Sequence, residues 1–357
     1  MKRLFTPLRL RGMTLRNRIA VSPMQQYLSP SALATDWHMV HLGSRAVGGA
    51  GLIIAESTAV LPEGRATSFD TGLWNIAQME SWIPIVKFVQ DQGAKIGIQL
   101  GHFGSKGSRT HPEDGFRSMS PSEGGWQTIS SSAVPPMPGM PTPRELSIKE
   151  IHLIQDAFVL AAQKAIAAGF DTIEIHGAHG YLAHQFYSAL INQRVDEYGG
   201  SFENRIRFLV EIAQKIRRSL PSAMPLLVRI SAVDFSDDPR AWTLTDSVAL
   251  AKKLKDVGVD LITTSGGGFV YPNKSNIYPG YQVSFSERVR REAQIATGAV
   301  GMITTAQQAE KILASEKADL IVMARKFLRN PYFALQAQRE LGIEVDAPTP
   351  YKRGFIF

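Results

Sequence analysis

The sequence predicts an α/β protein folded as a (β/α)8 barrel. One unit recurs along the chain: a helix with an apolar face, a turn with Gly or Ala, and a short run of Val, Ile and Leu. Such continuous apolar runs are typical of parallel strands that are covered by helices on both faces. Eight strands can be counted, and 357 residues suit one large barrel with insertions. We therefore expect a single domain over residues 1–357.

The predicted strands come in two groups. The complete turn-and-strand unit is found at 49–55, 92–98, 168–174, 257–262 and 317–322. Three further strands are expected at 18–24, 225–231 and 300–303. In most of the units a glycine stands where the preceding helix would end in the left-handed conformation, which supports the alternation of helix and strand.

Helices are expected between these strands, at 35–47, 79–92, 147–168, 201–220, 245–257, 286–296, 305–315 and 331–341. Ser147 and Glu150 have the spacing of a capping box, in which the two side chains satisfy free amides at a helix start. Ser201 is a preferred N-cap residue, and Pro221 ends the helix that it opens.

Two segments do not fit the alternation. Residues 101–146 are rich in Gly, Pro and Ser and follow the third strand. Irregular stretches of this length are uncommon and usually functional or disordered, so we interpret this one as a lid or excursion over the catalytic face. Residues 342–357 form a C-terminal tail after the last helix.

The composition excludes several classes of protein. The chain has no cysteine, which excludes disulfides, thiol catalysis, cysteine-bound zinc and iron–sulfur clusters. The net charge of +7 is spread along the chain, with its densest cluster at 288–291, so nucleic-acid binding is not expected. We find neither an apolar run of membrane-spanning length nor the apolar core of a signal peptide, and we expect a cytoplasmic enzyme acting on a small molecule.

Polar side chains gather directly after the fourth strand. His176 and His179 are followed by Tyr181 and a Gly-rich polar run. Because barrel enzymes place their active sites at the carboxyl ends of the strands, two imidazoles and a phenol would point toward one ligand. One core histidine beside a surface one is the plain alternative. A metal site is the other, but its third ligand, His184, would fall on the following helical turn.

Other strand ends contribute further candidates. The first strand ends in Ser22-Pro23-Met24-Gln25-Gln26-Tyr27, the third carries Gln99, and the fifth carries Arg229. An arginine inside an apolar strand is costly unless it is paired or faces a ligand, and an ion pair with Glu174 is the structural alternative. Gly301 and the pair Ala324-Arg325 stand where barrels commonly bind phosphate.

These motifs together resemble the old yellow enzyme family of flavin-dependent ene-reductases, in its shorter branch of thermophilic-like enzymes and xenobiotic reductases. The resemblance extends over nearly the whole chain. It is most specific in 171–205, from the histidine pair to Tyr198-Gly199-Gly200-Ser201-Phe202-Glu203-Asn204-Arg205, and it recurs at 300–303 and 324–331.

The resemblance implies a barrel that holds FMN at its mouth. The ribityl chain and ring edge would lie along Ser22, Pro23 and Met24, with Ser57 near the ring. The pyrimidine would meet Gln99 and Arg229, and a cation there stabilises the anionic reduced flavin. The phosphate would be held by Gly301, Ala324 and Arg325.

The resemblance also implies roles in catalysis. NADPH would reduce the flavin, and the substrate would then use the same face in a ping-pong reaction. His176 and His179 would bind an electron-withdrawing oxygen of an activated alkene, Tyr27 would line the pocket, and Tyr181 would donate a proton to the α-carbon.

The chain departs from the branch pattern at two positions. Gln25 stands where a cysteine is common, which implies a shifted reduction potential and a changed substrate preference. Ala324 stands where glycine is usual, and its methyl group would crowd the phosphate. The tail resembles one that enters a neighbouring active site, so Arg353 is expected to act in the next subunit of a homodimer or homotetramer.

Two other functions remain open at this point. A flavin-free barrel lyase or isomerase would need a strand-end lysine or carboxylate metal ligands, and Lys106 lies in a loop instead. A flavin-binding protein without ene-reductase turnover is compatible with the unusual Gln25. An iron–sulfur relative of the clostridial dienoyl reductase type is excluded by the lack of cysteine. The sequence leaves open the physiological substrate and the choice between NADPH and NADH.

Overall fold

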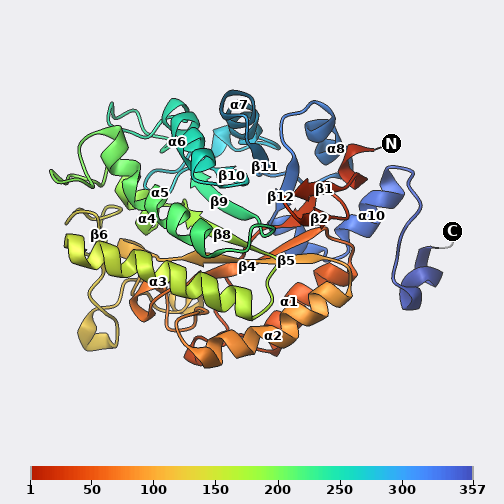
Figure 1. Cartoon of the computed structure of the whole chain (residues 1–357), viewed down its shortest axis with the longest axis horizontal. Coiled ribbons are helices and arrows are strands. Elements are labelled where there is room, and N and C mark those ends of the chain that lie inside the picture. Colours follow the sequence, from red (N-terminus) through yellow and green to blue (C-terminus); the bar gives the residue numbers. More distant parts are fainter. Residues whose placement is uncertain (1, 356–357) are drawn as a thin grey trace.

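The computed structural model, which describes residues 2–355, is a closed barrel of eight parallel strands (Figure 1). The predicted fold class is confirmed. Each strand pairs with its neighbours in chain order, and the last strand returns to the first. The barrel strands are β3 (Ile19–Val21), β4 (Leu52–Ala59), β5 (Lys95–Gly101), β8 (Thr172–Gly177), β9 (Leu226–Ser231), β10 (Leu261–Ser265), β11 (Ala296–Ala299) and β12 (Leu320–Met323).

Helices cover the outside of the barrel, as Figure 1 shows. They are α1 (Asp36–Val47), α2 (Ile76–Asp91), α3 (Ile148–Ala167), α5 (Phe202–Ser219), α6 (Leu244–Asp256), α7 (Val283–Ala293), α8 (Ala306–Ala314) and α10 (Phe333–Glu340). The predicted capping box of Ser147 and Glu150 is present, and the Ser201 hydroxyl accepts from the Asn204 amide. Asn75 caps α2, so that helix begins at Ile76 rather than at 79.

The predicted seventh strand was wrong. The strand is β11, and the expected segment 300–303 follows it instead of forming it. The sequence Ala-Thr-Gly-Ala of β11 has few large apolar residues, whereas Val300 and Ile303 are the β-branched residues typical of a strand, so the strand was predicted at 300–303. A side chain on Gly298 would press on Val322 and Thr263 of the neighbouring strands, at 3.0 and 3.1 Å, which explains why this strand carries small residues. The predicted helix 286–296 was therefore also too long at its end: α7 ends at Ala293, and β11 begins at Ala296.

Several short elements were not expected. A hairpin of β1 (Leu8–Leu10) and β2 (Met13–Leu15) packs its leucines against Leu52, Leu227 and Leu261, which lie at the amino ends of barrel strands. The hairpin therefore closes the amino end of the barrel. The remaining short helices are α4 (Leu182–Tyr187), α9 (Arg325–Arg329), η1 (Arg3–Phe5), η2 (Pro30–Ala32), η3 (Pro62–Gly64), η7 (Lys274–Asn276) and η8 (Thr349–Phe355).

The long stretch 101–146 is folded but contains little regular structure. It holds three 3-10 turns, η4 (Gly104–Lys106), η5 (Pro112–Asp114) and η6 (Pro121–Glu123), and a parallel pair of short strands, β6 (Ile129–Ser130) and β7 (Arg144–Glu145). Ile129 and Leu146 belong to the main hydrophobic cluster of the barrel. Figure 1 shows this region, with β6, at the end of the barrel away from both termini.

The barrel interior changes from apolar to polar along its axis. Below, the hairpin and the leucines of β4, β9 and β10 form a separate apolar cluster. Above them, toward the carboxyl ends, the buried residues include Gln99, Glu174, Arg229 and Thr263. Burying this many polar groups is unfavourable unless they serve each other or a ligand, so this end of the barrel is where a site is expected. Within residues 2–355, no helix is both long and apolar enough to cross a membrane.

Candidate active site

A cavity opens where the strands end at their carboxyl side. Its volume is about 180 Å³. The residues that line it are Ser22, Pro23, Gln25, Tyr27, Ser57, Gln99, Phe103, His176, His179, Tyr181, Arg229 and Ala324. The structure therefore brings together most of the residues that the sequence selected. Met24 is an exception, because it packs against the main hydrophobic cluster instead of lining this cavity.

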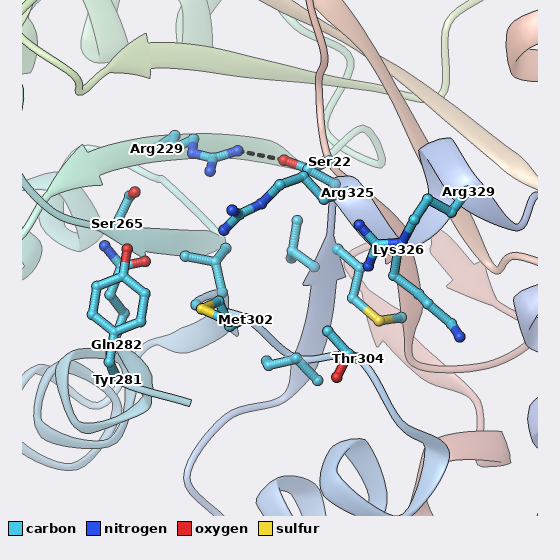
Figure 2. Close-up of a pocket in the computed structure, with 16 residues that line it drawn as sticks. Ser22, Arg229, Ser265, Tyr281, Gln282, Met302, Thr304, Arg325, Lys326 and Arg329 are labelled. Atoms are coloured by element: carbon cyan, nitrogen blue, oxygen red, sulfur yellow. Dashed lines mark hydrogen bonds between the residues drawn. The ribbon is translucent and has the colours of Figure 1, made fainter. Parts of the chain in front are cut away.

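A second cavity, of about 230 Å³, continues from the first and shares Ser22, Arg229 and Ala324 with it (Figure 2). Its other lining residues are Ser265, Tyr281, Gln282, Val300, Gly301, Met302, Ile303, Thr304, Val322, Met323, Arg325, Lys326 and Arg329. Gly301 and Arg325, both selected from the sequence, lie here. The two cavities together form one elongated site with a cationic far end.

Sequence reasoning missed several lining residues of the second cavity. Lys326 and Arg329 were part of a recognised motif but received no role, and Ser265 and Gln282 were not selected at all. Placing the seventh strand at 300–303 hid the loop that follows it. The basic helix start after β12 is the signal that could have selected Lys326 and Arg329.

Arg229 carries its positive charge into the interior at the junction of the two cavities. Its Nη1 donates to the Ser22 hydroxyl over 2.7 Å, as Figure 2 shows. Its buried Nε has no hydrogen-bond partner among residues 2–355, and no ion pair joins it to a described carboxylate. The pKa of Arg229 is lowered by burial, and the negative charge of Glu174 opposes that shift. The alternative of a direct ion pair with Glu174 is therefore not what the structure contains.

Ser57 reaches the cavity because β4 is irregular there. The register of β4 against β5 shifts between Ala55 and Ser57, which is a β-bulge, and bulges re-aim side chains next to active sites. Glu56, at the bulge, accepts from His38 over 2.7 Å and from the Gln26 amide over 2.9 Å. Through His38 and the backbone of Gln26, the buried Glu56 side chain connects α1 and the loop after β3 to the bulge. The Ser57 hydroxyl is left without a partner among the described residues.

The two histidines converge in the cavity. His176 Nε2 and His179 Nδ1 are 3.4 Å apart, and their rings are nearly perpendicular. His176 Nδ1 accepts from the Ala178 amide, and His179 Nε2 is 2.9 Å from the Ser265 hydroxyl. Burial, with a smaller contribution from the charge of Arg229, lowers the pKa of both rings well below the usual value. Both imidazoles are therefore neutral at physiological pH.

Tyr181 stands beside the pair. Its ring packs on Phe103, with centroids 4.1 Å apart, and meets His176 edge-on at 4.8 Å. Burial raises the pKa of the phenol above its usual value, and the nearby Tyr27 adds to the shift. The hydroxyl is thus protonated across the physiological range and makes no hydrogen bond within residues 2–355. It is available to a ligand in the cavity.

His184 is turned away from the cavity. Its Nδ1 accepts from the Gly180 amide, and its Nε2 donates to Asp234 over 2.9 Å, with both side chains fully buried. Asp234 also accepts from the Ser188 hydroxyl and the Trp242 amide. His184 therefore supports the loop that carries the histidine pair and does not join it. Among the described residues, no group of three or more His, Asp or Glu side chains is arranged to hold a metal.

Lys106, in the loop after β5, is nearly buried at the mouth. Its ammonium donates to the carbonyl oxygens of His179 and Gly268, and it lies 5.8 Å from the Tyr181 ring centre. Burial lowers the pKa of Lys106 to about 8. The lysine thus joins the loops after β5, β8 and β10, and it fixes the backbone at His179, whose φ is 61°.

Tyr27 occupies the rim of the cavity. Its φ is 56°, and its ring packs edge-on against His111 at 6.1 Å and Phe116 at 5.8 Å, both from the excursion 101–146. Burial, assisted by the charges of Asp70 and Glu56, raises its pKa to about 12. The excursion therefore contributes aromatic side chains to the mouth.

Gly301 and Ala324 differ in how strictly they are required. The φ of Gly301 is +109°, and an added Cβ would lie 2.9 Å from the Gln282 amide nitrogen, so a side chain there would be strained and would clash with Gln282. Ala324 has φ −105°, a negative value that does not call for glycine. The alanine in place of the usual glycine is therefore accommodated by the backbone.

The residues present fit FMN. Three buried polar atoms on the first cavity lack partners among residues 2–355: Gln25 Nε2, Ser57 Oγ and Arg229 Nε. Buried polar atoms are rarely left unpaired, so a polar ligand is expected between them. The second cavity offers Arg325, Lys326 and Arg329 to an anionic group. A flat polar ring with a phosphate tail satisfies both ends.

Comparison with known proteins agrees with this arrangement. The sequence model described as the NADH:flavin oxidoreductase / NADH oxidase family matches residues 3–344. The chain is 46% identical over 356 residues to the NADPH dehydrogenase of Geobacillus sp. (strain WCH70), and 44% identical to that of Bacillus subtilis (strain 168), each covering 99% of both chains. Among solved structures, morphinone reductase in complex with tetrahydroNAD superimposes with a TM-score of 0.77 and 28% identity, over 97% of this chain and 93% of that one. An old yellow enzyme homologue from Zymomonas mobilis gives a TM-score of 0.77 at 26% identity, over 96% and 94%.

Proposed function

The chain belongs to the NADH:flavin oxidoreductase / NADH oxidase family and is an FMN-dependent, old yellow enzyme-type NADPH dehydrogenase; from this premise we propose that it reduces the C=C bond of activated alkenes. The substrate class is an enone, nitroalkene or maleimide, in which an oxygen draws electrons from the double bond. FMN, when bound, supplies the hydride chemistry.

We assign the cofactor to the two joined cavities. The ring would be held by Ser22, Pro23, Gln25, Ser57, Gln99 and Arg229, and the phosphate by Gly301, Ala324 and Arg325. Met24 takes a supporting position behind this wall. Arg229 is a buried cation in this lining, and it would favour negative charge on a flavin ring held there. Lys326 and Arg329 add to the cationic end.

The histidine pair binds the substrate oxygen. A neutral imidazole has one N–H, and His176 must carry it on Nε2 because its Nδ1 accepts from a backbone amide. If the Ser265 hydroxyl donates to His179 Nε2, then His179 carries its proton on Nδ1. These two nitrogens face each other at 3.4 Å in the structure, and we propose that a bound substrate oxygen replaces this contact and accepts from both. Two neutral donors polarise that oxygen without adding a full charge to the site.

Tyr181 donates the proton that completes the reduction. Its hydroxyl is protonated and free of protein partners among residues 2–355, which is what a general acid requires. Phe103 and His176 fix its ring from two sides. The Tyr27 ring at the rim contributes to substrate binding. The excursion 101–146 restricts the entry of water at the mouth.

We also propose that the tail completes the site of a neighbouring subunit. Arg353 is exposed on η8, and Figure 1 shows the C-terminal segment beyond α10, at the end of the barrel away from β6. In its own chain the arginine therefore lies away from the mouth. A homodimer or homotetramer would be needed for Arg353 to reach a substrate.

The observation that carries the proposal is the convergence of the paired ring nitrogens and the Tyr181 phenol in one cavity with Arg229. The test is an anaerobic titration of the yellow protein with NADPH, followed by a cyclic enone or maleimide. We expect bleaching and then recovery of the flavin spectrum. Bleaching without recovery on any activated alkene would leave only a flavin-binding protein. A colourless protein that does not take up FMN would favour the lyase or isomerase, for which the carbonyl-bound Lys106 offers no support.

A further inference from the structure

Glu174 is a buried carboxylate that the proposed reaction does not use. It lies on β8, two residues before His176, so both side chains point into the barrel. Its exposure is 1%, and it forms no ion pair with any described residue. A buried carboxylate without an ion pair is costly, and such a group is retained only where it does something that an apolar residue does not.

Each oxygen of Glu174 accepts from one neutral donor. Oε1 accepts from Gln99 Nε2 over 2.7 Å, and Oε2 accepts from the Thr263 hydroxyl over 3.1 Å. Gln99 is its direct neighbour in the β5–β8 register. The charged group facing it is Arg229 on β9; burial raises the pKa of Glu174 above its usual value, and the positive charge of Arg229 opposes that rise. The contacts from β5 and β10 are uncharged.

The carboxylate dictates which way the Gln99 amide points. In the structure the amide presents its nitrogen to Glu174 Oε1, which is the orientation that an ionised carboxylate, a pure acceptor, requires. With Glu174 ionised, the opposite orientation would place two oxygen atoms 2.7 Å apart without a proton between them. The Gln99 carbonyl oxygen is therefore the end left for the cavity that Gln99 lines. An isolated glutamine would have no such preference.

The consequence is a fixed pattern of acceptor and donor in the cavity. Gln99 contributes an acceptor, and Arg229, with its unpartnered Nε, contributes donors. The pyrimidine edge of a flavin carries an N–H between two carbonyl oxygens, which matches an acceptor beside donors. A flipped amide would oppose its own donor to the N–H.

We propose that Glu174 is a positioning residue for FMN recognition: by holding Gln99 Nε2 it turns the Gln99 oxygen into the acceptor that selects the flavin N3–H. This inference rests on the FMN site proposed above. It differs from a role in charge balance, in which Glu174 would only offset Arg229, and from a purely structural role, in which its loss would lower stability alone.

Three variants separate these roles. Glu174→Gln keeps the shape and lets the Gln99 amide turn. Glu174→Asp keeps the charge but withdraws the carboxylate by one methylene. The matched control, Thr263→Val, removes the other hydrogen bond to Glu174 and leaves Gln99 Nε2 in place. For each protein, FMN is removed and added back, and the dissociation constants of FMN and of 3-methyl-FMN are measured together with the thermal midpoint.

In the wild type, we expect FMN to be preferred over 3-methyl-FMN. Glu174→Gln and Glu174→Asp should each weaken FMN about 10-fold or more, since a buried hydrogen bond is lost, and should reduce the preference at least about 5-fold. Thr263→Val should keep the preference within about 2-fold. In a Gln99→Ala background, Glu174→Gln should add no further change, because the two residues act through one contact.

An unchanged preference in both Glu174 variants would overturn the proposal. So would a loss in Glu174→Gln with full retention in Glu174→Asp, because that result assigns Glu174 to charge balance. Both outcomes leave the proposed function standing, since wild-type bleaching by NADPH is measured separately. A wild type that does not bind FMN would refute the proposed function itself.

Discussion

Replacing Tyr181 by Phe removes one hydroxyl and preserves the rest of the site. The ring contacts with Phe103 and His176, at 4.1 and 4.8 Å between centroids, do not involve the hydroxyl. The hydroxyl makes no hydrogen bond within residues 2–355, so no protein group loses a partner. The free energy of unfolding should therefore change by less than about 0.5 kcal/mol.

The catalytic effect should be much larger than the effect on stability. General acid catalysis contributes roughly 10²- to 10⁴-fold in rate, equivalent to about 3 to 5 kcal/mol of transition-state stabilisation. The substrate oxygen is bound by the histidine pair and not by this phenol, so the dissociation constant for a cyclic enone should stay within about 3-fold. Reduction by NADPH needs no proton from Tyr181 and should keep its wild-type rate.

Stopped-flow absorbance measures the two half-reactions separately. The reductive half-reaction with NADPH is the internal control. The oxidative half-reaction with a cyclic enone should slow by at least about 100-fold in Tyr181→Phe. An oxidative rate within about 5-fold of wild type would refute the assignment of Tyr181 as the proton donor. An equal loss in both half-reactions would instead indicate a disturbed flavin site.

Three further changes test other parts of the account. Gln25→Cys should shift the flavin midpoint potential, because the unpartnered Gln25 Nε2 is an amide donor on the ring cavity, and identical potentials in a spectroscopic redox titration would reject this. Deleting the residues after Ala347 should raise KM for the alkene and loosen the oligomer, with steady-state kinetics and light scattering as the measurements; unchanged values in both would count against a shared site. Burial raises the pKa of Asp70 to about 6, so its contribution to stability is present below about pH 4 and is lost as the pH rises through about 6. Asp70→Asn should remove up to about 3 kcal/mol of pH dependence, seen as thermal midpoints at pH 4.5 and 7 that differ less than in the wild type.

The parts of the fold that the sequence predicted are those with strong local signals. Gly169 followed by a β-branched run predicts β8, and the capping box of Ser147 and Glu150 predicts the start of α3. The position of β11 was predicted wrongly, because the packing of Gly298 against two neighbouring strands requires small residues. That requirement is visible only in the three-dimensional structure. The β1–β2 hairpin was not predicted, because its strands are only three residues each and are stabilised by packing against the amino end of the barrel.

The candidate site was predictable where residues follow a strand directly. His176 and His179 belong to one segment, so their proximity could be inferred from sequence. The contact of Gln99 with Glu174 joins two strands, and the tether from Lys106 to His179 joins two loops; both depend on barrel closure. The family resemblance selected Gln99 and His179 as site residues, but it did not select their partners Glu174 and Lys106.

The central claim is that a flat ring occupies the cavity between Arg229 and the paired histidines. A crystal structure of the FMN-loaded protein tests it most directly. We expect density for the ring along Ser22, Gln99 and Arg229, with the phosphate beside Gly301 and Arg325. Density for the flavin elsewhere, or an Arg229 side chain turned into an ion pair with Glu174 across an empty cavity, would contradict the account.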